Sequence, residues 1–159
     1  MSPPIKDNGS DDHKYMARCL ELAAMAAAAG EVPVGALVVQ DDRILGEGRN
    51  RCEELADPLA HAEMAALRAA LAAAGEGRLP AAVLYTNLEP CFMCTGALLH
   101  VRVARIVYGA KDPKFGACGS LANLPADPRL NHRCPVTTGV LAQQSAALLR
   151  QFFQQLRKS

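Results

Sequence analysis

The sequence lacks an apolar run long enough to cross a membrane, and it has no apolar segment near its start. A membrane-spanning helix needs about 18 or more apolar residues. Residues 1–12 hold Pro, Gly, Ser and charges where a signal peptide would be apolar. We therefore expect a cytoplasmic protein with no membrane contact. In that compartment the six cysteines stay mostly reduced, so a close cysteine pair favours metal binding or redox chemistry over a disulfide.

The chain also lacks internal repeats and any break in composition that would mark a second domain. Its 159 residues are 50% hydrophobic, which is enough for a substantial core and argues against disorder of the whole chain. We expect a flexible tail over residues 1–11 and one domain over residues 12–159.

The net charge of +1 hides an uneven distribution. Residues 1–99 hold 8 basic and 14 acidic residues, whereas residues 100–159 hold 9 basic and 2 acidic residues, so the two parts carry −6 and +7. A basic final third suggests an anionic partner, with nucleic acid as the leading candidate. An ordinary solvated surface is the alternative.

Apolar spacing, glycines and prolines predict helices that alternate with strands. The first helix should bury Met16, Leu20, Ala23 and Ala27. The helices are expected at residues 11–29, 59–74, 91–99 and 141–156, and the strands at residues 34–39, 43–48, 82–87, 102–108 and 135–140. Residues 111–133, rich in Gly, Pro and Asn, should form a long loop, and such loops are usually functional. This order predicts an α/β architecture with a mixed sheet between helices.

Cys91 and Cys94 are the first candidates for a metal site. A spacing of three puts both sulfurs on one face of a helix, and Pro90 just before them is typical of a helix start. The helix dipole stabilises thiolates at that end, so the pair can chelate one zinc ion. A redox-active pair is the alternative, although the surrounding sequence lacks the other elements of a thioredoxin-like motif.

His61 and Glu63 supply the remaining parts of a catalytic zinc site. They are two positions apart, about 200° around a regular helix, so both can reach one site only beyond the helix end. With His61 as third ligand, a fourth position stays open for water, and Glu63 can act as general acid and base. His132 is the substitute ligand if His61 points away.

The order His61-x-Glu63 followed by Pro90-Cys91-x-x-Cys94 is the signature of zinc deaminases, and resembles the cytidine/deoxycytidylate deaminase superfamily. Further motifs resemble the bacterial tRNA-specific adenosine deaminase family over about residues 12–157. They lie at residues 31–36, 46–50, 57–58, 88–91, 116–120, 130–133 and 146–153. Leu59 and Asn87 depart from that family's pattern, and Asn87 could affect the rim of the pocket.

The resemblance implies a three-layer α/β/α cytidine-deaminase-like fold with a central five-stranded mixed sheet. It also implies a homodimer with one Zn²⁺ per subunit, which converts adenosine to inosine at wobble position 34 of a tRNA anticodon stem-loop. The zinc would be held by His61, Cys91 and Cys94, with Glu63 as the proton shuttle. The implied substrate contacts are Val34, Asn50, Asp112, Lys114, Asn131 and Phe152.

Plainer interpretations exist for each part of this hypothesis. Val34 could be ordinary strand core, Asn50 a turn former and Lys114 a solvated loop charge. The same fold could deaminate a free base or nucleoside such as guanine, cytosine or cytidine. A non-catalytic, zinc-stabilised RNA-binding module is a further alternative, but a structural zinc site has no need of a carboxylate like Glu63 beside its ligands.

Overall fold

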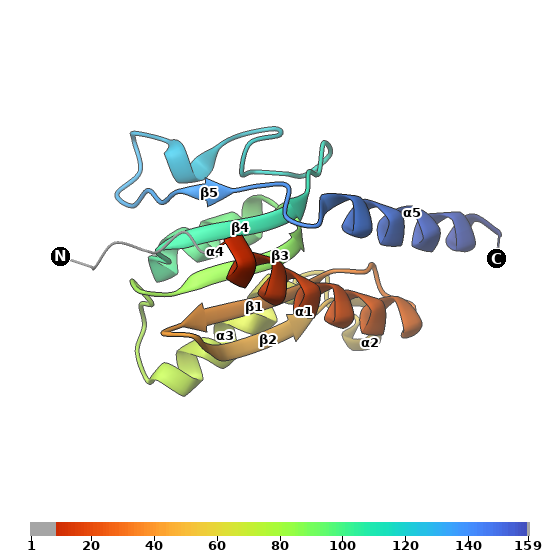
Figure 1. Ribbon diagram of the computed structural model, residues 1–159, viewed down its shortest axis with the longest axis horizontal. Helices are drawn as coiled ribbons and strands as arrows, with labels where there is room; N and C mark the ends of the chain where they lie inside the picture. The colour runs from red at the N-terminus through yellow and green to blue at the C-terminus, as the bar shows by residue number, and fades with distance from the viewer. Residues whose placement is uncertain (1–8, 159) are drawn as a thin grey trace.

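A five-stranded mixed sheet forms the centre of the computed structural model, which describes residues 9–158 (Figure 1). The strand order is β2-β1-β3-β4-β5. Strand β1 runs antiparallel to both of its neighbours, whereas β3, β4 and β5 are parallel to one another. The strands are β1 (Gly35–Gln40), β2 (Arg43–Arg49), β3 (Val83–Leu88), β4 (Arg105–Ala110) and β5 (Val136–Thr137).

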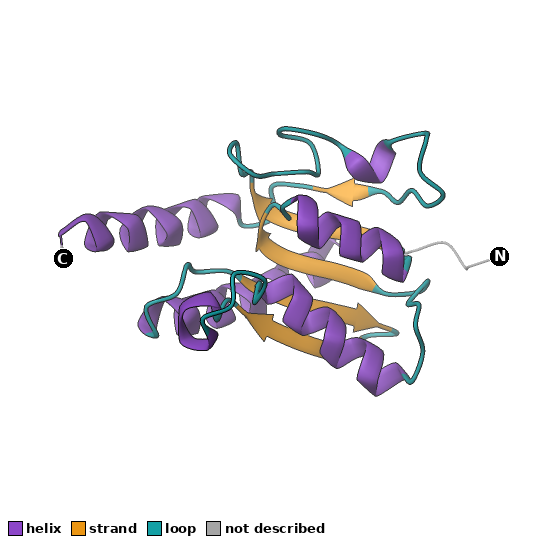
Figure 2. Cartoon of the chain, turned by 180° about the vertical axis from the view of Figure 1, so that it is seen from behind, coloured by secondary structure: helices purple, strands orange, loops and turns teal. Residues whose placement is uncertain are grey.

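Helices cover both faces of this sheet, so the predicted three-layer architecture is confirmed. Helix α1 (Gly9–Ala28) lies on the face turned to the viewer in Figure 1, and α5 (Ala142–Lys158) begins next to it against β4 and then projects beyond the strands. Figure 2 shows α3 (Ala62–Ala74) and α4 (Phe92–Val101) on the opposite face. None of the helices within residues 9–158 is long and apolar enough to span a membrane.

The element boundaries differ from the predicted ones in several places. Helix α3 begins only at Ala62, and the last strand is reduced to two residues. The loops predicted after β2 and β4 contain two short helices, α2 (Cys52–Leu55) and the 3₁₀ turn η1 (Leu124–Ala126). Residues 1–8 of the expected tail lie outside the described residues, and its last three residues belong to α1.

The buried side of α1 is rotated from the predicted one. Leu20 and Ala27 are only half-buried, because the helix packs on the sheet along a line shifted by about one residue. The fully buried apolar positions are Tyr15, Met16, Cys19, Leu22, Ala23 and Ala26. A buried ion pair also fastens this helix, since Asp12 accepts from Arg105 of β4 at 2.8 and 3.0 Å and from the Tyr85 hydroxyl at 2.7 Å.

Two glycines in β2 let α3 lie unusually close to the sheet. Gly46 and Gly48 are two positions apart, so they face the same side of the strand. A Cβ atom on Gly48 would lie well inside contact distance of the Ala62 carbonyl oxygen, and one on Gly46 would meet the Ala66 carbonyl in the same way. The absence of these side chains therefore sets how near the first turn of α3 comes to β2.

A buried carboxylate organises the start of the long loop after β4. Glu89 is 2% exposed and accepts hydrogen bonds at 3.0 Å from the backbone N–H groups of Asp112, Cys118 and Ser120. The Ser120 hydroxyl donates to the same carboxylate. Burial alone would raise the pKa of Glu89, but these donors, led by Ser120, hold it below its ordinary value. The loop is therefore tied to the segment that enters α4.

We expect Gly48→Ala to destabilise the protein by about 2 kcal/mol or more, because its Cβ meets helix backbone that cannot move away cheaply. Gly77→Ala is the matched control, since a Cβ there has nothing within 4 Å and needs no unusual backbone conformation. Urea unfolding of both variants measures the difference. Equal stabilities for the two would contradict the close approach of α3 to β2.

Candidate metal centre

His61 and Cys91 occupy equivalent places, because each is the N-cap residue of a helix. His61 precedes α3 and Cys91 precedes α4, both with extended backbone angles (φ −75°, ψ 152° and φ −74°, ψ 177°). The predicted helix at residues 59–74 would have enclosed His61, and the later start at Ala62 corrects that. His61 therefore lies outside the helix and Glu63 inside its first turn, which removes the difficulty of a two-residue spacing.

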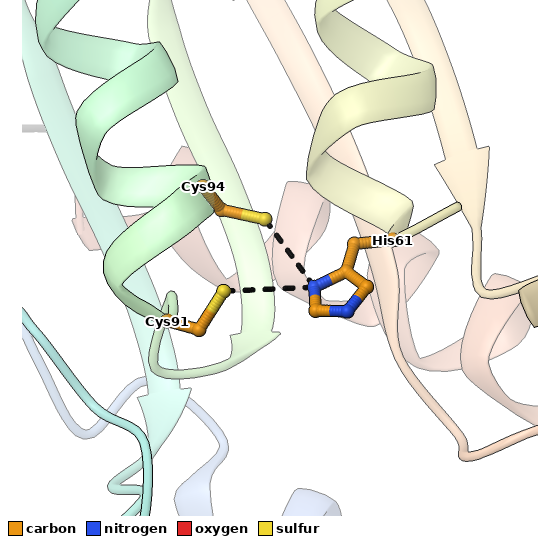
Figure 3. Close-up of side chains that lie close together, drawn as sticks. All are labelled: His61, Cys91 and Cys94. Atoms are coloured by element: carbon orange, nitrogen blue, oxygen red, sulfur yellow. Dashed lines mark hydrogen bonds between the residues drawn. The ribbon is translucent and has the colours of Figure 1, made fainter. Parts of the chain in front are cut away.

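The three predicted ligands come together between the two helices (Figure 3). His61 Nδ1 lies 3.6 Å from Cys91 Sγ and 3.5 Å from Cys94 Sγ. A tetrahedral zinc ion, with Zn–S near 2.3 Å and Zn–N near 2.0 Å, would hold sulfur and nitrogen about 3.5–3.6 Å apart. All three ligand atoms lie within 4.8 Å of one another. The cluster thus fits one zinc ion with three protein ligands and a fourth position to spare.

The surroundings of Cys91 favour its thiolate. Hydrogen bonds from Cys94 and then His61 lower the pKa of Cys91 to about 4, against the opposing effect of burial. Cys94 is fully buried, whereas Cys91 and His61 are half-buried. The cluster is therefore closed on the core side and accessible on the other, as a site that admits a small substrate must be.

Glu63 lies beside this cluster in a desolvated position. Its side chain is 4% exposed and interacts with Cys94. Burial raises the pKa of Glu63 to about 7, and a cation bound by the neighbouring ligands would lower it again. A carboxyl group whose pKa lies near neutrality can both accept and return a proton, which is what a general acid and base requires.

The alternatives for the metal ligands find no support. His132 bonds through Nε2 to the Val103 carbonyl at 2.8 Å, at the far end of α4 from the cysteines, so it does not replace His61. A redox-active cysteine pair does not require an imidazole nitrogen close to both sulfurs, as His61 Nδ1 is here. The His/Cys/Cys set accounts for all three groups at once.

Asn50 and Val34 lie next to the start of α3. The Asn50 backbone N–H donates to the Val34 carbonyl at 3.1 Å, and its side-chain Oδ1 accepts from the Ala62 N–H at 3.1 Å. Asn50 thus caps the backbone beside His61, while its Nδ2 has no hydrogen-bond partner among the described residues. Val34 is 5% exposed and packs in the core cluster that contains Ala62.

Asp112 and Lys114 lie on the loop that Glu89 holds. Asp112 Oδ1 accepts from the backbone N–H groups of Lys114 and Phe115 at 3.0 and 3.2 Å, so the carboxylate stabilises a tight turn. Lys114 is exposed. Gly116 of the same loop pairs with Cys91 in an isolated antiparallel bridge, which brings this turn to the metal centre.

Asn131 and Phe152 are not brought to the cluster. The Asn131 carbonyl accepts from Arg102 at 3.2 Å, and Arg102 ends α4, roughly 15 Å from Cys91 by the rise of ten helical residues. Phe152 is half-buried on α5, a helix that extends away from the sheet (Figure 1). Any contact of these two residues would involve parts of a substrate distant from the metal.

Asn87 does not shape the rim either. Its neighbours on β3 alternate between the two faces of the sheet, and Asn87 faces the α1 and α5 side. There its amide accepts from the Gly35 N–H at 2.8 Å and donates to the Pro33 carbonyl and Ser145 Oγ, both at 3.0 Å. This residue therefore joins β1, β3 and α5 behind the site.

Two exposed aromatic side chains beside the cluster were missed by the sequence analysis. Phe92 and Phe115 are 47% and 64% exposed. Their positions next to Cys91 and Gly116 were visible in the sequence, but nothing there indicated that the two segments would pair.

Comparison with known proteins agrees with this site. Residues 9–110 match the family described as the cytidine and deoxycytidylate deaminase zinc-binding region. A tRNA-specific adenosine deaminase from Haemophilus influenzae is 48% identical over 148 residues, which cover 92% of this chain and 86% of that protein.

Solved structures give the same result. One from a study of A-to-I editing by tRNA:A34 deaminases at the wobble position has a TM-score of 0.82 and 42% identity, and covers 86% of this chain and 99% of its own. A guanine deaminase from Nitrosomonas europaea has a TM-score of 0.73 and 26% identity, and covers 96% and 95%. The chain therefore belongs to the cytidine and deoxycytidylate deaminases, in the family of the tRNA-specific adenosine deaminases.

Proposed function

We propose that this protein is a zinc-dependent hydrolase that converts adenosine to inosine at the wobble position of tRNA anticodons. The observation that carries the proposal is the buried Glu63 beside a His61, Cys91 and Cys94 cluster of tetrahedral zinc dimensions. The relatives named above support adenosine in tRNA as the substrate. The tRNA-specific adenosine deaminases are 48% and 42% identical to this chain, whereas the guanine deaminase is 26% identical.

The metal ligands and Glu63 have separate roles in the deamination. A bound zinc ion would lower the pKa of water at its fourth position, so that hydroxide is available near neutral pH. Glu63 would accept a proton from the attacking water and give it to the departing amine. A C6–O bond forms on the adenine ring, the C6–N6 bond breaks, and ammonia leaves. Glu63 is 4% exposed, so bulk water has little access to its carboxyl group.

Several residues would hold the nucleotide. Among residues 9–158 the Asn50 amide Nδ2 has no hydrogen-bond partner, which suits a hydrogen bond to the extruded nucleoside, and Val34 would support the base. Asp112 and Lys114 would line the path of the adjoining nucleotides. Asn131 and Phe152 would meet parts of the RNA distant from the target adenosine.

The substrate is tested by incubating the protein with anticodon stem-loops that carry adenosine at the wobble position, and separately with guanine, cytosine and cytidine. We expect inosine in the RNA and no product from the free bases or nucleoside. RNA binding should weaken steeply with salt because basic residues contact phosphates. Turnover of a free base in the absence of RNA editing would establish the alternative function.

We expect Glu63→Gln to keep one zinc per chain and to lower kcat by roughly 10²- to 10⁴-fold, because the proton shuttle is lost while the ligands remain. Cys91→Ala should lose the zinc itself. Metal analysis and deamination rates separate these effects, with exposed Glu76→Gln and the free thiol variant Cys52→Ala as controls. Normal turnover by Glu63→Gln would contradict its role.

We also propose a cytoplasmic homodimer. Helix α5 supports it, because its only buried residue is Ser145 while Phe153 and Leu156 are 42% and 56% exposed. An amphipathic helix with an uncovered apolar side is stabilised by a partner surface. Light scattering should give twice the single-chain mass of 16.9 kDa. A monomer at micromolar concentration would contradict the proposal.

A further inference from the structure

An exposed aromatic pair flanks the metal centre and has no role in the chemistry described above. Phe92 follows the ligand Cys91 and is 47% exposed, and Phe115 precedes Gly116 and is 64% exposed. Large apolar side chains at the edge of an active site lose free energy by contact with water unless something covers them. Part of the substrate that lies next to the reacting group could cover these two side chains.

The backbone brings the segments that carry the two residues together. Cys91 and Gly116 form an antiparallel bridge, and the Ala117 N–H donates to the Pro90 carbonyl at 3.0 Å. Phe92 follows Cys91 in the chain, and Phe115 precedes Gly116. Opposed residues in such pairing have Cα atoms about 4.5–5.5 Å apart, so Cys91 and Gly116 are that close and the residues next to them, Phe92 and Phe115, lie near each other beside a metal ligand.

The loop that carries Phe115 is held firmly. Asp112 Oδ1 accepts from the Phe115 N–H at 3.2 Å, and Glu89 accepts from the Asp112 N–H at 3.0 Å. A Cβ atom on Gly116 would collide with the Glu89 side chain, so only glycine permits this close packing. The exposed phenyl ring is therefore presented from a fixed backbone, and a ligand need not order the loop to use it.

Charge decides which kind of ligand fits. Lys111 and Lys114 are exposed on the same loop, and the Asp112 carboxylate is occupied by backbone donors. Aromatic faces together with cations are the means by which proteins hold single-stranded nucleic acid, through stacking on bases and contact with phosphates. An apolar protein surface would gain nothing from the lysines.

We propose that Phe92 and Phe115 form a stacking surface for a base of single-stranded RNA next to the target adenosine. This inference rests on the proposed function. Stacking tolerates any base, because each has an aromatic face. The pair would thus add affinity for RNA over a free nucleoside without reading the sequence.

The experiment compares wild type, Phe115→Ala and Phe115→Trp on an anticodon stem-loop, and on loops with an abasic site on either side of the target. Phe115→Ala should lower kcat/KM by roughly 5- to 100-fold on the intact loop, mostly through KM, with unchanged zinc content. Phe115→Trp should restore it. On the loop that lacks the stacked base, wild type and Phe115→Ala should be equal.

Met25→Ala is the matched control, because Met25 is 51% exposed on α1, across the sheet from α4. Equal KM for wild type and Phe115→Ala on the intact loop would overturn the inference, as would a Phe115→Ala loss that persists on both abasic loops. Anisotropy with a labelled single-stranded RNA measures binding without turnover. Failure of the proposed function would abolish deamination by wild type while leaving a Phe115-dependent binding difference in place.

Discussion

The approach of α3 and α4 to one another through their N-termini is the constraint on which the site depends. His61 and Cys91 each cap one helix in extended conformation, so their side chains point into the space between the helix ends. Two positive helix ends facing the same space favour a thiolate at Cys91. Cys91, whose pKa is lowered to about 4, is thus stabilised as the thiolate that a metal requires.

Several features of the fold serve to hold this approach. The glycines of β2 let α3 come close to the sheet, and the Asn50 amide caps the N–H of Ala62. On the other side, Glu89 and Gly116 dock the loop after β4 against Cys91. Each of these contacts holds backbone near a ligand. Together they explain how the nitrogen–sulfur distances stay close to tetrahedral zinc geometry although His61 and Cys91 are only half-buried.

The same arrangement separates chemistry from recognition. Glu63 and Cys94 are buried and protected from water, whereas Phe92, Phe115 and Lys114 are exposed on the two segments that the Cys91–Gly116 bridge joins. A substrate must therefore deliver its reacting base into a desolvated position while the rest remains outside. This division suits a nucleotide that is turned out of a longer strand.

The chemistry of the site was determined by the sequence itself, because His, Glu and Cys at those spacings are specific for a zinc deaminase and because periodicity predicted the helices and strands of an α/β fold. Only the tertiary structure decided where the helices begin and hence how His61 and Glu63 share one site. It also decided that Asn87 points away from the pocket and that Asn131 lies at the far end of α4. The proximity of the segments that carry Phe92 and Phe115 depends on a bridge between residues 91 and 116, and contacts between segments distant in the chain leave no local pattern in the sequence.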